Sequence, residues 1–352
     1  MKKFSRPSIS APRRRQGPAL AFALAILATP AAAEPSSDPE DARGTWSFTL
    51  ENDIIAGTDR DYTNGALLSY IAPANDLPWV GRFLKSKLFW LEGADDWRMS
   101  YGVGQNMYTP QDISRRFPDP DDRPYAGFLY GSVGISADTR ASSGAPRQLD
   151  VLALDIGIVG PGSLAEPTQK HVHELIDSDD PKGWDEQLAT EVAFRLLYER
   201  SWRASGKWDL PLLPLEGDVT PHVGLALGTV ATYAAAGASF RIGEDLGDDY
   251  GPPRVRPALG SPGFFRDIDG FSWYLFAGVQ GRAVARDLFI QGNTFKDSPG
   301  VNVEPLQLDI QAGFAIQVGR VEMAFTQVLR SPQHTRKGRW NRFGSVNLRT
   351  RF

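Results

Sequence analysis

The feature that most constrains the fold is a two-residue alternation of apolar and polar side chains, which recurs along most of the sequence. In the C-terminal segment SVNLRTRF, residues 346, 348, 350 and 352 would share one face of a strand, and the polar residues between them the other. The terminal aromatic Phe352 resembles the C-terminal signal by which bacterial outer-membrane barrels are recognised for assembly. An ordinary edge strand can also end in this way, so the segment alone does not decide the fold.

The same alternation recurs in about a dozen segments, each close to the ~9–11 residues that a tilted membrane strand needs. These segments are 45–51, 62–72, 97–107, 126–138, 151–158, 189–203, 220–231, 233–243, 271–284, 304–318, 320–331 and 342–352. Tryptophan and tyrosine cluster near the strand ends, as in the aromatic girdles of membrane barrels. A soluble β-sandwich could contain as many strands, but the bulky apolar faces favour an all-β fold, a transmembrane antiparallel β-barrel of about 12 strands.

The first 33 residues have the composition of a secretory signal peptide. Six basic residues precede or flank a short apolar core at 19–28, and three alanines at 31–33 suit a cleavage site. We therefore expect a signal peptide at 1–33 and a single outer-membrane barrel domain at 34–352. Removing the signal changes the formal net charge from -4 to -10, which disfavours a nucleic-acid partner. The absence of cysteine excludes a disulfide framework.

Three long connections interrupt the predicted strands. Residues 110–124 and 244–270 are polar and rich in proline and glycine, so we expect both to be extracellular loops. The connection at 161–184 differs, because Val172, Leu175 and Ile176 are spaced as one apolar face of a helix. We predict one short helix there, at about 164–178, in an extracellular loop.

The stretch LENDIIAGTDRDYTNG, residues 50–65, places many hydrogen-bonding groups where a first strand turns into a second. Turn chemistry explains much of it, because Asn-Gly and aspartate are common in hairpin turns. It does not explain Asn52, which by alternation shares the apolar, lipid-facing side of the strand. A polar amide there is costly unless it is covered or liganded. Oxygen donors of this kind, with neighbouring Asp53, suit a hard cation such as calcium.

Four histidines are the candidate bases. A histidine in a loop is most often a solvated surface residue, but His171 and His173 lie in the predicted helix and are followed by acidic residues that could orient an imidazole. These acidic residues are Asp177, Asp179 and Asp180. His222 lies inside a predicted strand, where packing in the lumen is expected, and His334 has no evident partner.

Several motifs, in this order, resemble the outer-membrane lipid A 3'-O-deacylase family. They are LENDIIAG (50–57), TDRDYTNG (58–65), GQNMYTP (104–110), SRRFPDPDDRPYAG (114–127), IGIVGPGS (156–163), and His173 followed by PKGW (181–184). The resemblance implies a twelve-stranded barrel with an active site outside the barrel wall, under a helix from an extracellular loop. It also implies calcium-dependent hydrolysis of an acyl ester of lipid A in the bacterial outer membrane, with lipid A (lipopolysaccharide) and outer-membrane lipids as partners.

The resemblance also implies roles for individual residues. His173 would be the general base, Asn52 and Asp53 would form the calcium and oxyanion region, and Thr63 would complete it. Arg115 would lie near the scissile carbonyl or a substrate phosphate. Arg116 and Arg123 could also meet the phosphates of lipid A. The family's carboxylate that supports the histidine corresponds best to Asp179, or alternatively to Asp180. The chain departs from the family pattern here, because a longer glutamate is common and six residues separate His173 from Asp179.

Two other readings of the same residues remain open at this point. The chain could be a non-enzymatic outer-membrane barrel, a small pore or structural protein whose rim residues only order its loops. Alternatively, the same hydrolytic site could act on phospholipid. The sequence does not distinguish between these possibilities, nor does it give the acyl position or the oligomeric state.

Overall fold

The structure is a computed structural model of the chain. It describes residues 43–53, 61–91, 93–139, 146–176, 178–203, 215–244, 246, 250, 268, 270–336 and 338–352. The predicted signal peptide at 1–33 lies outside the described residues, as do the side chains of 61–63. Within the described residues, no helix is both long enough and apolar enough to cross a membrane.

Twelve strands and several short helices follow one another along the described chain. The strands are β1 (Thr45–Asn52), β2 (Asp61–Ile71), β3 (Asp96–Thr109), β4 (Ala126–Thr139), β5 (Arg147–Val159), β6 (Glu191–Arg203), β7 (Glu216–Gly228), β8 (Ala231–Glu244), β9 (Phe271–Asp287), β10 (Leu306–Val318), β11 (Val321–Arg330) and β12 (Asn341–Arg351). The helices are α1 (Trp79–Lys87), α2 (Ala165–Ile176) and α3 (Leu288–Gln291), with 3-10 turns η2 (Phe89–Leu91), η3 (Pro161–Ser163) and η4 (Trp184–Glu186).

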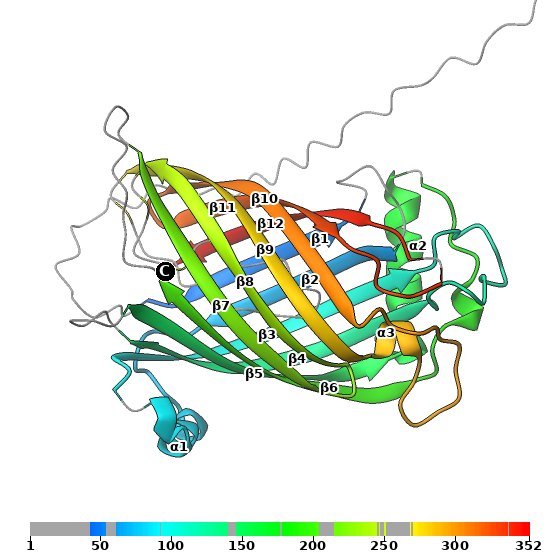
Figure 1. Cartoon of the computed structure of the whole chain (residues 1–352), viewed down its shortest axis with the longest axis horizontal. Helices are drawn as coiled ribbons and strands as arrows, with labels where there is room; N and C mark the ends of the chain where they lie inside the picture. Colours follow the sequence, from blue (N-terminus) through cyan, green and yellow to red (C-terminus); the bar gives the residue numbers. More distant parts are fainter. Residues whose placement is uncertain are drawn as a thin grey trace, which may run out of the picture. The chain divides into compact units, whose positions relative to one another are not determined.

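The strands form one closed antiparallel barrel in which each strand pairs with its neighbours in sequence (Figure 1). β1 closes the barrel against β12, in a register that runs from Thr45 opposite Arg351 to Asn52 opposite Gly344. Closure leaves no free edge, so the strands satisfy one another's backbone groups, as a structure in hydrocarbon must. The predicted fold class is therefore confirmed, and all twelve predicted segments are strands.

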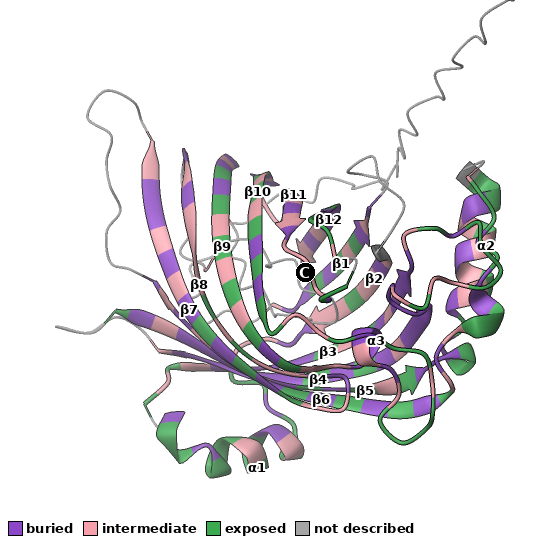
Figure 2. Ribbon diagram, turned by 45° about the vertical axis from the view of Figure 1, so that its right-hand side comes forward, coloured by how far each residue is buried: buried purple, intermediate pink, exposed green. Residues whose placement is uncertain are grey.

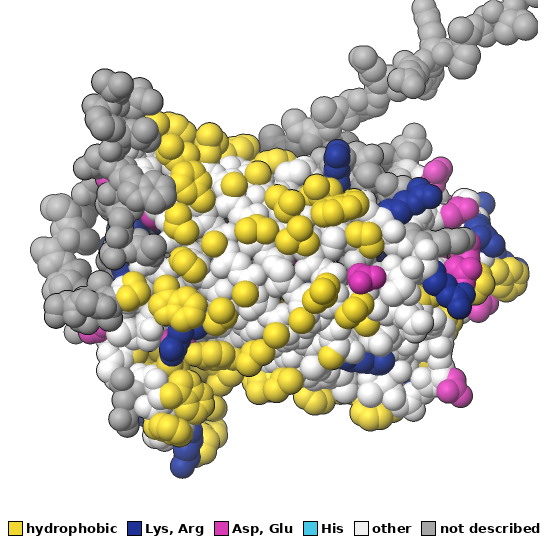
Figure 3. Space-filling model, viewed as in Figure 1, with side chains coloured by type: hydrophobic (Ala, Val, Ile, Leu, Met, Phe, Trp, Pro, Cys, Tyr) yellow, Lys and Arg dark blue, Asp and Glu magenta, His cyan; other side chains and the backbone are white. Residues whose placement is uncertain are grey.

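The alternation seen in the sequence separates the outside of the barrel from its lumen. On β5, Leu154, Ile156 and Ile158 face outward and are exposed, whereas Asp155 between them is buried. Figure 2 shows this change between buried and exposed residues along the strands. On the face that Figure 3 shows, hydrophobic side chains cover much of the wall. An apolar outer surface of this kind suits contact with lipid.

Buried ion pairs and aromatic side chains fill the lumen. The pairs include Arg195 with Asp155 at 2.6 Å, Arg330 with Asp309 at 2.8 Å, Arg241 with Asp218 at 2.5 Å, and Arg349 with Glu322. At the end near α2, Phe289 of α3 stacks on Tyr108 with ring centroids 4.2 Å apart, in a cluster that also contains Phe128 and Phe343. Because these residues come from β3, β4 and β12 as well as α3, the cluster reaches across the lumen.

Two expectations about the connections were wrong. The first is that 110–124 and 244–270 are both extracellular loops. Most of 244–270 lies outside the described residues, but β8 ends at Glu244 and β9 begins at Phe271 at the opposite end of the barrel from the connections at 110–124 and 161–184. At that end, the backbone N–H of Gly319 donates to the carbonyl of Gly270, and that of Arg351 to the carbonyl of Arg320. The second is α1, which the strand pattern did not reveal. It lies outside the barrel at the end opposite α2 (Figure 1).

Candidate active site

A row of outward-facing positions crosses five neighbouring strands near the end of the barrel that carries α2. Asn52 of β1 pairs with Gly344 on one side and Asn64 of β2 on the other; Asn64 pairs with Met107 of β3, and Met107 with Gly127 of β4. Asn52 continues the outward face of exposed Phe48 and Leu50, as the alternation predicts, but it is only partly exposed. The row therefore places two amide side chains next to the part of the wall on which α2 sits.

The strand β2 is irregular within this row. Its register with β3 shifts between Tyr62 and Asn64, so Thr63 has no direct partner in β3 and forms a β-bulge. Bulges bend a strand and re-aim side chains, and they are over-represented beside active sites. The side chain of Thr63 itself is not described, so its predicted part in the site stays a prediction. Asp53, directly after β1, is completely buried.

Helix α2 rests directly on the outer wall of β3 and β4. It begins after Leu164, which adopts a left-handed conformation with φ 58°, and its first residue, Ala165, is buried against Gly127. Gln105 of β3 donates its side-chain amide to the carbonyl of Ser163 at 2.7 Å. On the exposed side, Lys170 donates to Glu166 at 2.7 Å, which raises the pKa of Lys170. The predicted helix is thus present, and it covers the outside of the barrel.

His173 is buried on the inner side of α2, and its hydrogen bonds determine where its ring proton resides. Trp184 can only donate, and its indole N–H donates to Oε1 of Gln169 at 2.7 Å. The amide nitrogen of Gln169 then faces Nε2 of His173 at 3.4 Å, and Nδ1 of His173 lies 2.5 Å from the carbonyl oxygen of Asp179. Both contacts are satisfied when Nδ1 carries the proton and Nε2 holds the lone pair. This is the tautomer that a general base acting through Nε2 requires.

Asp179 reaches the imidazole through its main chain. Its carbonyl oxygen accepts the Nδ1 proton, whereas its carboxylate is on an exposed residue, as is that of Asp180. The chain turns back after α2 because the backbone N–H of Ser178 donates to the carbonyl of His173 at 3.0 Å. Asp177 lies outside the described residues. The group that orients the imidazole is therefore a peptide carbonyl.

An apolar cluster connects α2 to the loop after β3. Its members are Met107, Ile113, Tyr125, Ala165 and Trp184. The rings of Tyr125 and Trp184 lie 5.0 Å apart, and the backbone N–H of Lys182 donates to the carbonyl of Ile113 at 2.9 Å. Met107, which belongs to this cluster, is two strands from Asn52, or about 10 Å at ordinary strand spacing. The His173 network and the amide row are thus parts of one region of the outer wall.

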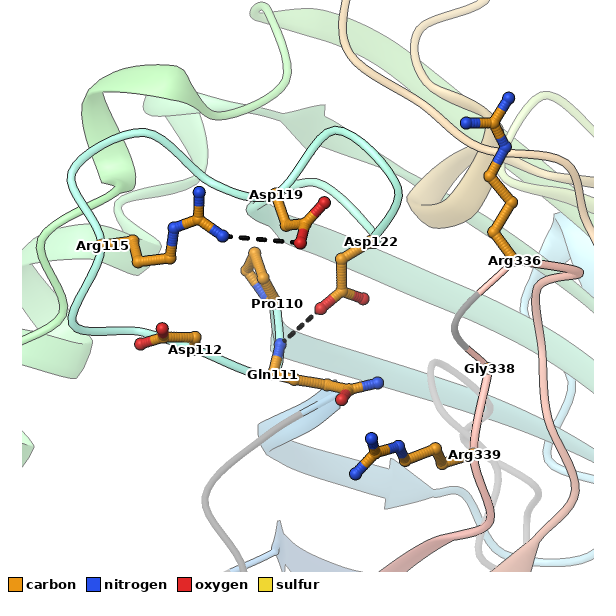
Figure 4. A pocket seen from close by; sticks show the side chains of 9 residues that line it. All are labelled: Pro110, Gln111, Asp112, Arg115, Asp119, Asp122, Arg336, Gly338 and Arg339. Carbon is orange, nitrogen blue, oxygen red and sulfur yellow. Dashed lines mark hydrogen bonds and ion pairs between the residues drawn. The ribbon is translucent and has the colours of Figure 1, made fainter.

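Arg115 lies on an exposed rim next to this region. Its side chain is 48% exposed, faces Asp119 at 3.4 Å, and lines a cavity of about 530 Å³. Figure 4 shows Arg115 and Asp119 on one side of the cavity and Arg336 and Arg339 on the other. On the same rim, a hydrogen bond from Ser114 lowers the pKa of Asp112. Arg115 is therefore placed where a polar headgroup could approach it from solvent.

Arg123 does not share this position, and the prediction that it meets a lipid phosphate was wrong. It is 1% exposed and lies 4.8 Å from the ring of Tyr108, with a side-chain hydrogen bond to Gln333 at 3.3 Å. The Arg-Pro segment turns into β4 here, so the guanidinium enters the lumen rather than the outer surface. Arg116 is exposed, and its guanidinium lies over the ring of Phe117.

The other three histidines are separate from the site. His171 is exposed on the outer side of α2, and His222 lies in the barrel with Nε2 3.0 Å from Oε1 of Gln280, as expected of lumen packing. His334, for which no partner was evident, is buried 3.5 Å from Asp122. Burial, reinforced by the nearby charge of Arg123, lowers the pKa of His334.

Sequence reasoning missed two residues that shape the site. Gln169 stands four residues before His173 on the same helix face, and this spacing indicates that the two side chains are in contact. Its orientation toward His173 depends on the hydrogen bond that it accepts from Trp184. Gly127 is the second. It is the last residue of the motif at 114–127, but nothing in the sequence shows that a helix packs on it. Among the described residues, no group of three or more His, Cys, Asp or Glu side chains is arranged to hold a metal.

The fold and this region define a membrane-spanning β-barrel with a helix-covered candidate active site on its outer wall. The family model for the outer membrane protein LpxR matches residues 20–352. The chain therefore belongs to the LpxR family, and it is a protein of the outer membrane. Among curated proteins, none matches the sequence.

One solved structure supports this fold, and two others are similar to a smaller extent. LpxR from Salmonella typhimurium superposes with a TM-score of 0.65 at 20% identity, covering 88% of this chain and 100% of that one. The β domain of the Bordetella autotransporter BrkA gives a TM-score of 0.41 at 12% identity, covering 89% of this chain and 100% of that one. The translocator domain of NalP from Neisseria meningitidis gives 0.37 at 10% identity, covering 88% and 87%.

Proposed function

We propose that this protein is an outer-membrane esterase that hydrolyses the 3'-acyloxyacyl ester of lipid A, with His173 activating water. The observation that carries the proposal is the buried His173, whose Nδ1 donates to the carbonyl of Asp179. It lies on the inner side of helix α2, which covers the outer wall beside Asn52 and Asn64. The lipid A substrate follows from the resemblance to the deacylase family. The outward position of the region supports it.

The chemistry needs a nucleophile, a base and a place for negative charge. A water oxygen attacks the ester carbonyl while Nε2 of His173 takes the proton, and the electron pair of the C=O bond moves to its oxygen. When the tetrahedral intermediate collapses, the bond to the sugar oxygen breaks and the imidazolium returns the proton to that oxygen. The products are the free acyloxyacyl acid and a sugar hydroxyl. General base catalysis of this type contributes about 10²–10⁴-fold.

Negative charge on the carbonyl oxygen requires polar groups on the same outer surface. The side-chain amide of Asn52 is one such donor, and oxyanion donors contribute about 10²–10³-fold each. Arg115 stands at the solvent rim, where it would bind a substrate phosphate or approach the carbonyl. Thr63, at the bulge of β2, would complete this group in the proposed site.

Calcium fits the donor set that this part of the chain offers. Asp53 directly follows Asn52 and is completely buried, and Asn64 pairs with Asn52, so one carboxylate residue and two amide residues stand at this end of β1 and β2. Hard oxygen donors of this kind are those that calcium selects. Asn52 and Asp53 would hold the ion. When bound, it would supply positive charge that stabilises the oxyanion.

The substrate class is consistent with the surface around the site. Below the row of Asn52 and Met107, the outward residues Leu50, Val103 and Val133 are exposed and apolar. A lipid whose ester reached His173 could therefore keep its acyl chains against the wall, in hydrocarbon. The pore alternative lacks such support, because the cluster around Phe289 and the buried ion pairs occupy the lumen.

The decisive experiment compares His173→Gln with His171→Gln in the full chain. Both substitutions lie on α2, but His171 is exposed and His173 is buried. We expect mass spectra of lipid A from cells to show the loss of the 3'-acyloxyacyl mass with the wild type and His171→Gln. His173→Gln would leave lipid A unchanged while the barrel keeps its folded mobility on a gel. Equal deacylation by His173→Gln would refute the proposal.

Two further measurements separate the alternatives. Asp53→Asn and chelation should each lower deacylation, and added calcium should restore activity to the chelated wild type but not to the variant. Purified protein should be offered lipid A and phospholipid in the same detergent. If the protein hydrolysed only phospholipid, and if His173→Gln abolished that hydrolysis, the mechanism would stand but the substrate would be phospholipid and not lipid A.

A further inference from the structure

Helix α1 has an unexplained surface. Its inner side packs on the outward wall of β3 and β4, where Leu84 and Leu88 meet Met99 and Ile135 in one apolar cluster. The approach is close, because a Cβ on Gly81 would stand 3.2 Å from the sulfur of Met99. Figure 2 shows α1 lying alongside the barrel rather than in its lumen.

The side of α1 turned away from the barrel is also apolar. Trp79 is 74% exposed and Phe83, one turn later, is 54% exposed, and in η2 Phe89 and Trp90 are 70% and 52% exposed. Hydrophobic side chains gather in Figure 3 at the place that α1 occupies in Figure 1. Four large aromatic side chains are exposed on one short segment, and exposed apolar patches of this kind mark surfaces that contact a protein or a membrane.

A basic edge accompanies this aromatic patch. The helix carries Arg82, Lys85 and Lys87 and no acidic residue. Lys85 Nζ lies 5.2 Å from the ring centroid of Trp97, and Lys87 Nζ lies 5.5 Å from that of Phe83, so both chains run along aromatic surface with their charges outward. Arg82 also stabilises the start of α1, because its guanidinium donates to the carbonyl of Leu77 at 2.6 Å.

We propose that α1 and η2 form an interfacial anchor that binds anionic phospholipid in the leaflet at its end of the barrel. The aromatic patch adjoins the outer wall that faces lipid, since Met99 and Ile135 under α1 continue along β3 and β4 to exposed Val103 and Val133. Aromatic residues with basic neighbours are the composition of helices that lie in the membrane interface. The cations select anionic headgroups.

The leaflet can be named if the proposed function holds. α2 must then face the outer leaflet, where lipid A lies, and α1 at the opposite end faces the periplasmic leaflet, which is made of phospholipid. The anchor would hold the barrel at a fixed depth, with the row around Asn52 level with the ester bonds of its substrate. The anchor itself does not depend on hydrolysis, so its test is separate.

The absence of cysteine allows a single-site test in the full chain. Phe83→Cys, Val103→Cys and Asp297→Cys would each carry one environment-sensitive fluorophore in vesicles of phosphatidylcholine and phosphatidylglycerol. Val103 is 64% exposed on the wall of β3, and Asp297 is exposed in the connection after α3. We expect acyl-chain-brominated lipid to quench the labels at 83 and 103, and aqueous iodide to quench the label at 297. A label at 83 that behaves like the one at 297 would overturn the anchor.

To test whether α1 prefers anionic lipid, either phosphatidylglycerol or phosphatidylcholine is brominated, but not both in the same vesicle. At equal mole fractions, brominated phosphatidylglycerol should quench the label at 83 several-fold more strongly than brominated phosphatidylcholine. Lys85→Glu with Lys87→Glu should remove this preference while leaving Arg82 and the quenching at 103 unchanged. Equal quenching by both lipids in the parent protein would overturn the anionic headgroup. In detergent, where no leaflet sets the depth of the barrel, the Lys85→Glu, Lys87→Glu variant should deacylate lipid A at the rate of the parent. Loss of activity in both proteins would therefore count against the proposed function and not against the anchor.

Discussion

Gly127 offers the sharpest test of whether α2 must sit directly on the barrel. A Cβ at this position would lie well under 3.0 Å from both Oγ of Ser163 and Cβ of Ala165, whereas ordinary contact begins near 3.4 Å. The strand cannot retreat, since β4 pairs with β3 and β5 along its length, so Gly127→Ala should lift the start of α2 by about 1 Å. A displacement of that size near a reacting centre costs about 100-fold in rate.

The matched control is Gly131→Ala on the same strand and the same outward side. A Cβ there would meet only the carbonyl oxygen of Gly102, at 4.0 Å, so the methyl fits without movement. We expect Gly131→Ala to deacylate lipid A at the rate of the wild type and Gly127→Ala to be about 100-fold slower. Both barrels should unfold at the same temperature in gel-mobility assays, because α2 lies outside the strand ladder.

A size exchange makes the argument refutable in both directions. Adding Ser163→Ala and Ala165→Gly to Gly127→Ala removes the two atoms nearest to the new methyl group, Oγ of Ser163 and Cβ of Ala165. We expect this triple variant to recover most of the lost rate. Full activity in the Gly127→Ala variant would show that α2 tolerates displacement, and no recovery in the triple variant would show that the loss had another cause.

Three other substitutions test the site and the lumen. Gln169→Leu should lower deacylation about tenfold with the barrel intact, because Nε2 of His173 loses the amide that defines its orientation. Burial lowers the pKa of His334 in the folded protein, so the folded state is most stable above pH 6.5 and loses stability as the pH falls through the folded-state pKa. Tryptic cleavage at Arg336 should therefore accelerate on acidification, and His334→Gln should abolish this pH dependence. Phe289→Ala should destabilise the barrel by about 3–5 kcal/mol in thermal gel-shift assays, while Phe295→Ala, at a 75% exposed position, leaves it unchanged.

The barrel was predictable because two-residue periodicity directly reflects its two environments. Each of the twelve strands has one side in lipid and one in the lumen, so the pattern survives in every segment. Helix α1 escaped the same reasoning because apolar groups occupy two of its sides, Leu84 against the barrel and Phe83 away from it. A helix that is covered on one side by protein and on another by lipid loses the single apolar stripe that identifies amphipathic helices.

The side of the membrane assigned to each loop shows a different limit. Composition suggested that 244–270 belongs with 110–124, because both are polar and rich in proline and glycine. Strand parity decides otherwise, since connections alternate between the two ends of an antiparallel barrel. Counting the predicted strands would have placed the segment correctly, so the error arose from weighting loop composition above topology.

Within the site, the sequence located residues but not their hydrogen bonds. Asn52 was placed on the outer face by alternation, and His173 on a helix by its neighbours. The tautomer of His173 could not be derived in this way, because it depends on Trp184, which meets Gln169 only after the chain has turned back. The same turn brings the carbonyl of Asp179, rather than its carboxylate, to the imidazole.

The two helices divide the outer surface of β3 and β4 between them. At one end Met107 and Gly127 lie under α2, at the other Met99 and Ile135 lie under α1, and only the stretch around Val103 between them is open to lipid. The same two strands thus fix the height of the candidate site and that of the aromatic patch on α1. Because a barrel wall does not stretch, the distance between them is constant. A protein anchored at α1 would therefore present His173 at one depth of the opposite leaflet, as hydrolysis of an ester at a fixed depth in a lipid requires.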